Sequence, residues 1–168
     1  VNTDNDFNRN SVEGSKITNE SNVFTFNENI NAGYVNYNRA FKGFMIQAGL
    51  RYEHTTATGD SYPLNADGSV NRDINIDPFK RNYGGLFPSA AITFNKKPTN
   101  QWGISYSRRI DRPAYQDLNP FEFKLDEYTF QKGNTQLRPQ YTNTIGITNT
   151  YKYKLTTALN YSHVSDVF

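Results

Sequence analysis

The sequence predicts an all-β protein with about six antiparallel strands. Aromatic residues make up 15% of the chain, including 12 Tyr and 12 Phe, whereas all hydrophobic residues together make up only 36%. Aromatic residues and Thr favour pleated strands, and the abundant Asn and Gly favour turns. Apolar and polar side chains alternate in several segments, as they do in strands with one apolar face, and no segment shows helical periodicity.

Five segments show this alternation clearly, and every second residue in them points to the same face of a sheet. They span residues 43–54, 86–95, 101–107, 141–151 and 155–163. A sixth segment, residues 23–38, is less regular. Phe24 and Phe26 have one parity, whereas Val35 and Tyr37 have the other. We therefore expect a β-bulge near Gly33 to exchange the two faces.

Each clear segment has one apolar and one polar face. The apolar row, which we expect to face lipid, consists of Phe44, Ile46, Leu50, Tyr52, Ile92, Phe94, Trp102, Ile104, Tyr106, Ile145, Tyr151, Leu159 and Tyr161. The polar row is mostly uncharged and includes Gly49, Ser89, Ser105, Gly146 and Asn160. Aromatic residues toward the strand ends and a crowded polar face are typical of a transmembrane β-barrel, with lipid outside and water inside.

The connections between the strands alternate in length. Residues 39–43, 96–100 and 151–154 are hairpin-sized. The connections at about 58–83 and 111–137 are far longer than ordinary loops. The short turns therefore lie at one end of the sheet and the long loops at the other, which is the pattern of outer-membrane barrels with long extracellular loops.

Alternation alone also fits a soluble β-sandwich that buries its apolar face against a second sheet. The wet face of a sandwich normally carries Lys and Glu, whereas the polar row is mostly Gly, Ser, Thr, Asn and Gln. The residues favour the barrel but leave open a soluble carbohydrate-binding β-sandwich or a surface adhesin module. The net charge of +2 does not indicate a nucleic-acid surface, and the lack of Cys excludes disulfides and thiolate metal sites.

The segment YSRRIDRPAYQDLNPFEFKLDEYTFQKGNTQLRPQYTN, residues 106–143, closely resembles the TonB-dependent-receptor-like outer-membrane β-barrel family of the Bacteroidetes type. The matching motifs are YSRRIxRP, LNPF, GNxxLRPQ and the following YTN, and the hairpin that leads into FMIQAGLRYEHT is also similar. The resemblance covers residues 22–168, whereas residues 1–21 are expected to be a polar loop or leading segment.

This resemblance implies that the chain is a partial barrel, a piece of a larger one with about 22 strands around a plug. Such barrels lie in the bacterial outer membrane and take up ligands at the cell surface with energy passed on by TonB. The implied partners are outer-membrane lipid, the rest of the same barrel and its plug, TonB through a segment absent from this chain and, as a further candidate, a surface lipoprotein. The resemblance implies neither an enzymatic activity nor a cofactor.

The second long loop begins where two prolines, Pro113 and Pro120, prevent further strand pairing because they lack an N–H. Its charged and aromatic residues are candidate ligand contacts: Arg112, Tyr115, Asp117, Phe121, Phe123, Tyr128 and Phe130. The aromatic side chains of this loop either pack on one another or face a ligand.

Three charged residues, Arg51, Glu53 and Arg109, have the parity of the polar row and are candidates for the barrel lumen. Two roles are open for them. They either form an ion network on the barrel wall or line the path of a substrate.

The sequence contains no recognisable catalytic or metal motif. The two histidines, His54 and His163, have no nucleophile at a known spacing, so we expect no catalytic residues and no enzyme. Three acids in the first long loop, Asp67, Asp73 and Asp77, raise the question of calcium binding. Their spacing does not fit an EF-hand, and turn chemistry is the better interpretation.

Overall fold

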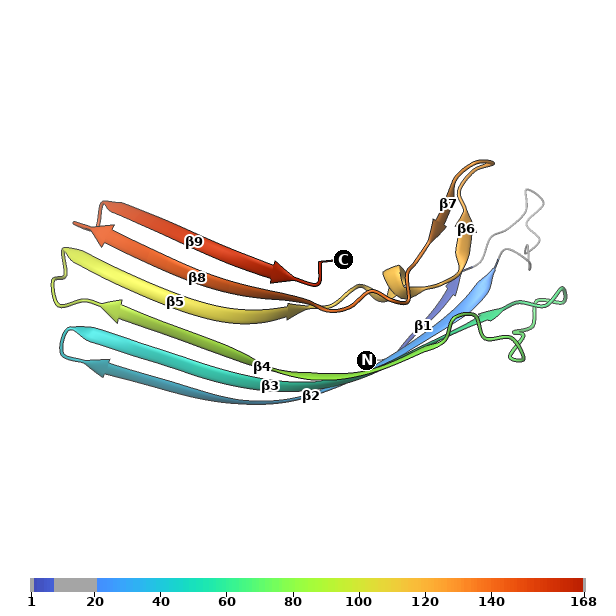
Figure 1. Ribbon diagram of the computed structural model, residues 1–168, viewed down its shortest axis with the longest axis horizontal. Helices are drawn as coiled ribbons and strands as arrows, with labels where there is room; N and C mark the ends of the chain where they lie inside the picture. The colour runs from blue at the N-terminus through green and yellow to red at the C-terminus, as the bar shows by residue number, and fades with distance from the viewer. Residues whose placement is uncertain (1, 8–20, 168) are drawn as a thin grey trace. The chain divides into compact units, whose positions relative to one another are not determined.

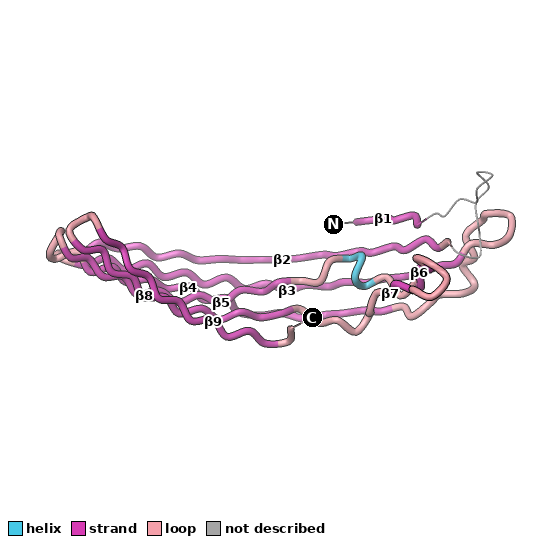
Figure 2. The backbone as a smooth tube through the Cα atoms, turned by 90° about the horizontal axis from the view of Figure 1, so that it is seen from above, coloured by secondary structure: helices cyan, strands magenta, loops and turns pink. Residues whose placement is uncertain are grey.

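The computed structural model describes residues 2–7 and 21–167, and in this part of the chain the protein is all-β. Among these residues, no helix is long and apolar enough to cross a membrane. The strands are β1 (Asn2–Phe7), β2 (Asn22–Phe41), β3 (Phe44–Pro63), β4 (Phe79–Phe94), β5 (Asn100–Asp111), β6 (Glu122–Lys124), β7 (Phe130–Lys132), β8 (Gln140–Tyr151) and β9 (Leu155–Ser165). A single turn of 3-10 helix, η2 (Tyr115–Leu118), lies between β5 and β6 and is drawn in cyan in Figure 2.

Seven strands form one sheet in the order β1-β2-β3-β4-β5-β8-β9, and β6 and β7 form a separate two-stranded sheet. Every pairing with a defined register is antiparallel. Consecutive strands of the large sheet are neighbours, except that the β6–β7 hairpin is inserted between β5 and β8. In the described part of the chain this sheet is open, with β1 and β9 at its edges.

The chain divides into two compact units, which we describe separately. The loop unit contains residues 1–30, 55–83 and 113–137, and the strand unit contains residues 31–54, 84–112 and 138–168. The strands β2, β3 and β4 contribute residues to both units.

Three short turns connect the strands of the strand unit, and all three lie at the same end of its strands (Figure 1). The β2–β3 turn contains Gly43 at φ +93°, a backbone conformation that glycine adopts without strain. In the β8–β9 turn, Lys152 and Tyr153 both have positive φ, and the Lys154 amide donates to the Tyr151 carbonyl. Two central residues with positive φ match the right-handed twist of the flanking strands, as in a type I′ hairpin turn. These are the short connections that the sequence predicted.

The register of the strand unit keeps the apolar row on one face. Ile104 on β5 lies opposite Ile92 on β4 and Ile147 on β8, and Ile147 in turn lies opposite Leu159 on β9. Most side chains of this row are exposed, for example Leu159 at 71%, and Phe44, Ile46 and Tyr106 are half-buried. The apolar row therefore does not form an internal core in the strand unit.

The polar row lies on one common face, as predicted. A Cβ on Gly49 would lie 2.6 Å from Asn36 Oδ1 and 2.7 Å from Ser89 Oγ. In the same way, a Cβ on Gly146 would lie 2.7 Å from Asn160 Oδ1 and 2.8 Å from Ser105 Oγ. Glycine at these positions makes room for the polar side chains of the neighbouring strands.

The prediction of a β-bulge near Gly33 is wrong, because even-numbered residues of β2 share a face of the sheet with odd-numbered residues of β3 on both sides of Gly33. In the strand unit, Asn36 of β2 adjoins Gly49 of β3. In the loop unit, Phe24 of β2 belongs to the same buried cluster as Ala57 of β3. Even-numbered residues of β2 thus meet odd-numbered residues of β3 in both units. In the loop unit this face is buried and carries apolar residues, whereas in the strand unit it carries the polar row. The apolar residues of β2 therefore change parity along the strand.

The strands β3 and β4 extend farther than the alternation predicted. The first long connection spans only residues 64–78, rather than about 58–83, and the second runs between β5 and β8 and contains η2, β6 and β7. The extension of β3 carries small buried side chains on one face, including Thr55, Ala57 and Ser61. Apart from Tyr62, its sequence lacks a large apolar residue on either face, so the alternation rule could not detect it.

The strand β1 was not expected from the sequence, which predicted a polar loop or leading segment over residues 1–21. It pairs with the first residues of β2, from Asn2 opposite Asn27 to Phe7 opposite Asn22. The remainder of the predicted segment, residue 1 and residues 8–20, lies outside the described residues.

Candidate functional site

The loop unit has a small apolar core of its own. Phe24 and Phe26 of β2, Ala57 of β3 and Leu118 of η2 are buried, with Leu118 only 3% exposed. The partly buried side chains that pack against them are Phe79, Tyr115 and Leu137. Because Leu118 and Tyr115 both belong to η2, this core fixes the start of the second long connection on the sheet.

A buried network of polar side chains adds to this attachment. Asn22 Nδ2 on β2 donates to Ser61 Oγ on β3 at 2.9 Å and to Asn119 Oδ1 at 3.2 Å. Asn119 Oδ1 also accepts the Phe121 amide at 3.1 Å. Asn22, Ser61 and Asn119 are each at most 1% exposed. Since buried polar groups are costly when they lose a partner, the network specifies one position for Asn119 on the sheet.

Two buried polar atoms of this network, Asn22 Oδ1 and Asn119 Nδ2, have no hydrogen-bond partner among the described residues. Each such group destabilises the folded state by about 1–3 kcal/mol. The apolar core and the satisfied hydrogen bonds of Asn22 and Asn119 offset this cost and hold the second long connection on the sheet.

Arg81 at the start of β4 holds the end of the same connection. Its guanidinium donates to the backbone carbonyls of Thr135 and Leu137. The guanidinium also lies over the ring of Phe79, 5.1 Å from the centroid. The planar fork of an arginine suits two neighbouring acceptors, so one side chain fixes two residues of the chain.

The segment after β7 contacts the backbone of η2 and of Asn119, the residue that follows it. The Gly133 amide donates to the Asn119 carbonyl at 3.0 Å, and the Asn134 amide donates to the Asp117 carbonyl at 2.7 Å. A Cβ on Gly133 would lie 2.5 Å and 2.7 Å from these two carbonyl oxygens. Glycine is therefore required at position 133 for this close approach. The predicted ligand contact Asp117 thus has a structural role through its carbonyl.

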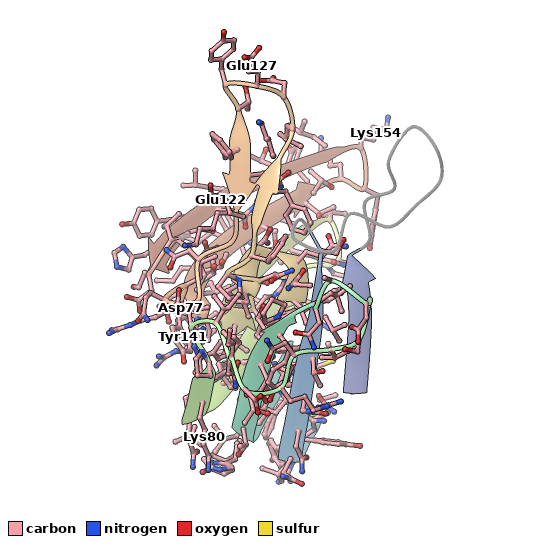
Figure 3. The ribbon with its side chains drawn as sticks, turned by 90° about the vertical axis from the view of Figure 1, so that its right-hand side faces the viewer. Asp77, Lys80, Glu122, Glu127, Tyr141 and Lys154 are labelled. Carbon is pink, nitrogen blue, oxygen red and sulfur yellow. The ribbon has the colours of Figure 1, made fainter. Side chains whose placement is uncertain are left out.

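The β6–β7 hairpin carries most of the exposed aromatic residues of this connection. Tyr128 is 87% exposed and Phe130 is 55% exposed. In contrast, the rings of Phe121 and Phe123 pack edge to face, with centroids 5.3 Å apart. Figure 3 shows Glu127 at the tip of the hairpin and Glu122 nearer its base. The predicted loop aromatics therefore divide into an internally packed group and an exposed group.

The hairpin tip is ordered by Asp126. Its carboxylate accepts the Tyr128 amide at 2.8 Å. This backbone hydrogen bond, followed by one from the Thr129 hydroxyl, lowers the pKa of Asp126 below its usual value. The Leu125 amide closes the turn on the Thr129 carbonyl at 2.9 Å.

The first long connection is built from side-chain turns. Asp67 accepts hydrogen bonds from the hydroxyl and the amide of Ser69, and these two bonds lower the pKa of Asp67. The Asp73 amide donates to Asn71 Oδ1. Within residues 2–7 and 21–167, no group of three or more acidic, His or Cys side chains could hold a metal ion. Asp67 thus serves turn chemistry.

The strand unit contains a partly buried ion cluster. Glu53, 9% exposed, accepts Arg51 Nε at 3.1 Å and Arg112 Nη2 at 2.7 Å. Arg51 and Glu53 were predicted to lie together, but the second arginine on Glu53 is Arg112, which we had placed in the ligand loop. The predicted third member, Arg109, lies on β5 opposite Thr142 of β8.

An aromatic pair extends this cluster. Arg51 lies 5.4 Å from the ring centroid of Phe87, and Phe87 stacks on Tyr141 at 6.4 Å. Arg108 lies over the other end of the pair, 5.2 Å from the Tyr141 centroid. Phe87 is only 5% exposed. Alternation did not predict this arrangement, although Phe87, a large aromatic residue with the parity of the polar row, was a signal for it.

The loop unit also contains an open pocket of about 510 Å³. Asp77 and Pro78 of the first long connection line one part of it, and residues 120 and 132–136 of the second line the other. The pocket thus joins two segments that are more than 40 residues apart in the sequence, and neither loop alone would form it.

An exposed apolar row, a polar face with small residues, short turns at one end and long ordered connections are typical of a segment of a transmembrane β-barrel. The model of the Outer membrane protein beta-barrel family matches residues 1–168, and the chain therefore belongs to this family. Its location is the bacterial outer membrane, where lipid surrounds the barrel. Membership in this family excludes the alternative of a soluble β-sandwich.

Two further comparisons give no relative. No curated protein matches the chain, and no solved structure matches it.

Proposed function

We propose that this chain is part of an outer-membrane receptor that captures a ligand at the cell surface and imports it with energy supplied through TonB. One observation carries this proposal: the two long connections fold into a loop unit with a core and a pocket, whereas the other connections are minimal turns. Long loops are ordered at a cost in chain entropy, and ordered long loops are usually functional.

The resemblance of residues 106–143 to TonB-dependent receptors supports the uptake role. In this proposal the barrel continues beyond the described strands, and the plug and the segment that contacts TonB belong to other parts of the same protein. A surface lipoprotein remains a candidate partner at the extracellular side.

A second candidate function is adhesion, and the exposed side chains of the β6–β7 hairpin favour it. Leu125, Tyr128 and Phe130 are 59%, 87% and 55% exposed. Aromatic side chains on a projecting hairpin suit binding to another surface. An adhesin would need the hairpin but would not need energy from the inner membrane.

The test compares two deletions in cells that carry the full-length protein. In one variant, residues 122–132 are replaced by Gly-Gly, which removes the hairpin but keeps Phe121 and Gly133. In the control, residues 96–99 in a short turn are replaced in the same way. A peptide epitope inserted at the hairpin tip, between Asp126 and Tyr128, reports surface exposure on intact cells.

The receptor proposal predicts that the hairpin deletion reduces nutrient uptake as strongly as inactivation of TonB, whereas the short-turn variant does not. Adhesion alone would leave uptake unchanged in both deletions and lower cell attachment in the hairpin variant. Detection of the epitope only in permeabilised cells would contradict both functions, since both require an extracellular hairpin.

The epitope belongs at the tip because the structure excludes the Lys132–Asn134 segment as an insertion site. The sequence KGN suggests a turn, but the Gly133 amide is bonded to the Asn119 carbonyl and the Asn134 amide to the Asp117 carbonyl. An insertion there would break the bonds that hold the pocket wall formed by residues 132–136.

A further inference from the structure

The pocket of the loop unit has the size and the fixed walls of a ligand site. Its volume of about 510 Å³ lies within the range of roughly 300–1,000 Å³ that is common for small-molecule sites. Its lining includes Asp77, Pro78, Pro120, Lys132, Asn134 and Gln136. Figure 3 shows Asp77 on the side of the hairpin's base rather than at its tip, so the pocket is separate from the exposed aromatic tip.

The wall that carries Asp77 is held by β3. The Ile76 amide donates to the Ser61 carbonyl at 2.8 Å, one residue before Asp77. The Ser61 amide in turn donates to Asn75 Oδ1 at 3.0 Å, and Asn75 Nδ2 donates to Asp60 at 2.7 Å. The chain on this side of the pocket is thus fixed to a strand immediately before the charged residue.

The opposite wall is fixed by a different set of bonds. Besides the bond of the Gly133 amide to the Asn119 carbonyl, the Gln136 amide donates to Asn134 Oδ1 at 2.8 Å. The Leu137 amide donates to the Asn134 carbonyl at 3.2 Å, and Arg81 holds the carbonyl groups of the same turn. Both walls are therefore in place before a ligand binds, which lowers the entropy cost of binding.

Asp77 has an unusual backbone conformation at the edge of this pocket. Its φ is +45°, in the left-handed region that L-residues rarely adopt. It also precedes Pro78, and a residue before proline is normally restricted to extended conformations. This conformation occurs at a residue that lines the pocket and carries one of its two charges.

Only two of the lining residues carry a charge, and the charges are opposite. Asp77 and Lys132 line the same pocket, and neither forms an ion pair with another described residue. Asn134 and Gln136 add uncharged amide groups, and Pro78 and Pro120 add apolar surface. The pocket thus offers one carboxylate that can pair with a cation, one ammonium group that can pair with an anion, and neutral hydrogen-bonding groups.

This combination disfavours the common alternatives. A phosphate group would meet one cation but also an unpaired carboxylate. A divalent cation would meet only one carboxylate, and the ammonium group of Lys132 on the same pocket would repel it. A sugar ring is usually bound on an aromatic face, and the described lining contains no aromatic residue.

We propose that the pocket binds a short zwitterionic peptide, with the ligand ammonium at Asp77, the ligand carboxylate at Lys132 and the ligand backbone at Asn134 and Gln136. The proposal rests on the proposed function, because it names the class of ligand that the receptor captures. Unlike the proposed function, it concerns only the binding of the ligand and not its import.

The experiment measures binding of alanyl-alanine to the full-length barrel purified in detergent, by calorimetry and ligand-observed NMR. The comparison ligands are N-acetyl-alanyl-alanine, which lacks the ammonium, and alanyl-alanine amide, which lacks the carboxylate. The variants are Asp77→Asn and Lys132→Gln. Asn also tolerates the left-handed conformation, so Asp77→Asn preserves the loop. The control variants, Asp73→Asn and Lys80→Gln, remove the same charges elsewhere in the loop unit.

We expect alanyl-alanine to bind, and each blocked ligand to bind about two- to fivefold more weakly, as is common for partly exposed charge pairs. In Asp77→Asn, acetylation should no longer weaken binding, whereas amidation still should. Lys132→Gln should show the reverse pattern. Such a cross-over requires direct pairing, because a general loss of structure would weaken all ligands together.

Equal binding of the free and the blocked peptides would overturn the proposal, and so would loss of binding in the control variants. Absence of alanyl-alanine binding to the wild-type protein would also overturn it. Uptake that depends on the hairpin and on TonB without peptide binding would leave the proposed function intact and refute only the peptide ligand. Peptide binding without TonB-dependent uptake would support the peptide ligand and refute the proposed function.

Discussion

Leu118→Ala is the perturbation that tests whether the loop unit depends on its own core. Leu118 is 3% exposed and packs with Phe24, Phe26 and Ala57. Truncation of a buried Leu to Ala destabilises proteins by about 2–5 kcal/mol, depending on how far the surroundings collapse. This cluster is small and its neighbours Phe79 and Tyr115 are only partly buried, so we expect the lower end of this range.

A loss of about 2 kcal/mol in local stability corresponds to roughly 30-fold more frequent opening. The Gly133 amide reports this opening because its partner, the Asn119 carbonyl, is next to Leu118. Hydrogen exchange at Gly133 and Asn134 should therefore become about 30-fold faster in Leu118→Ala. The strand unit should keep its protection, since its strands β5, β8 and β9 pair without contributions from the loop unit.

The matched control is Leu125→Ala in the same connection. Leu125 is 59% exposed, so its truncation should leave exchange at Gly133 unchanged. Equal exchange in Leu118→Ala and the wild-type protein would refute the inference that the apolar core fixes the loop. Loss of protection throughout β5 and β8 would refute the separation of the two units.

Three further predictions concern the backbone, the apolar row and pH. Gly133→Ala should loosen the second long connection, seen as faster proteolysis, because its Cβ would clash with backbone oxygens, whereas Gly33→Ala, with nothing within 4 Å, should not. Ile104→Arg should impair barrel assembly by roughly 2–4 kcal/mol if it lies near the bilayer midplane, as measured by heat-dependent mobility in gels, and Ile104→Leu should assemble normally. The Asp67 carboxylate has a lowered pKa in the folded protein. Its contribution to the turn should thus be complete above the unfolded value of about 3.9 and be lost as the pH falls through the lower folded value. The amide shift of labelled Ser69 should therefore stay constant from pH 8 to pH 5 and change only in stronger acid, and a transition near neutral pH would contradict this assignment.

The sequence by itself determined the all-β class, the apolar row and the division into short and long connections. Alternation with a period of two is a local property, and it identified the apolar row, which the registers of Ile92, Ile104 and Ile147 align across strands. The difference between short turns and long connections is equally local. The short turns that the sequence predicted are those of the structure, because the backbone of residues such as Gly43 is set by neighbouring residues.

Only the tertiary structure decided how the long connections are used. The bond between Asn22 and Asn119 joins residues 97 positions apart, and the bonds from Arg81 to Thr135 and Leu137 span more than 50 positions. No periodic pattern encodes such contacts, because they depend on how the chain returns to the sheet.

The face of β2 shows the same limit in a single strand. Sequence reasoning interpreted the change of apolar parity between Phe24 and Val35 as a bulge, since it assumed one apolar face throughout. In the structure one face of β2 is covered by Leu118 in the loop unit and carries Asn36 beside Gly49 in the strand unit. What covers a face decides whether that face is apolar, and the covering segment comes from a part of the chain about 90 residues away in the sequence.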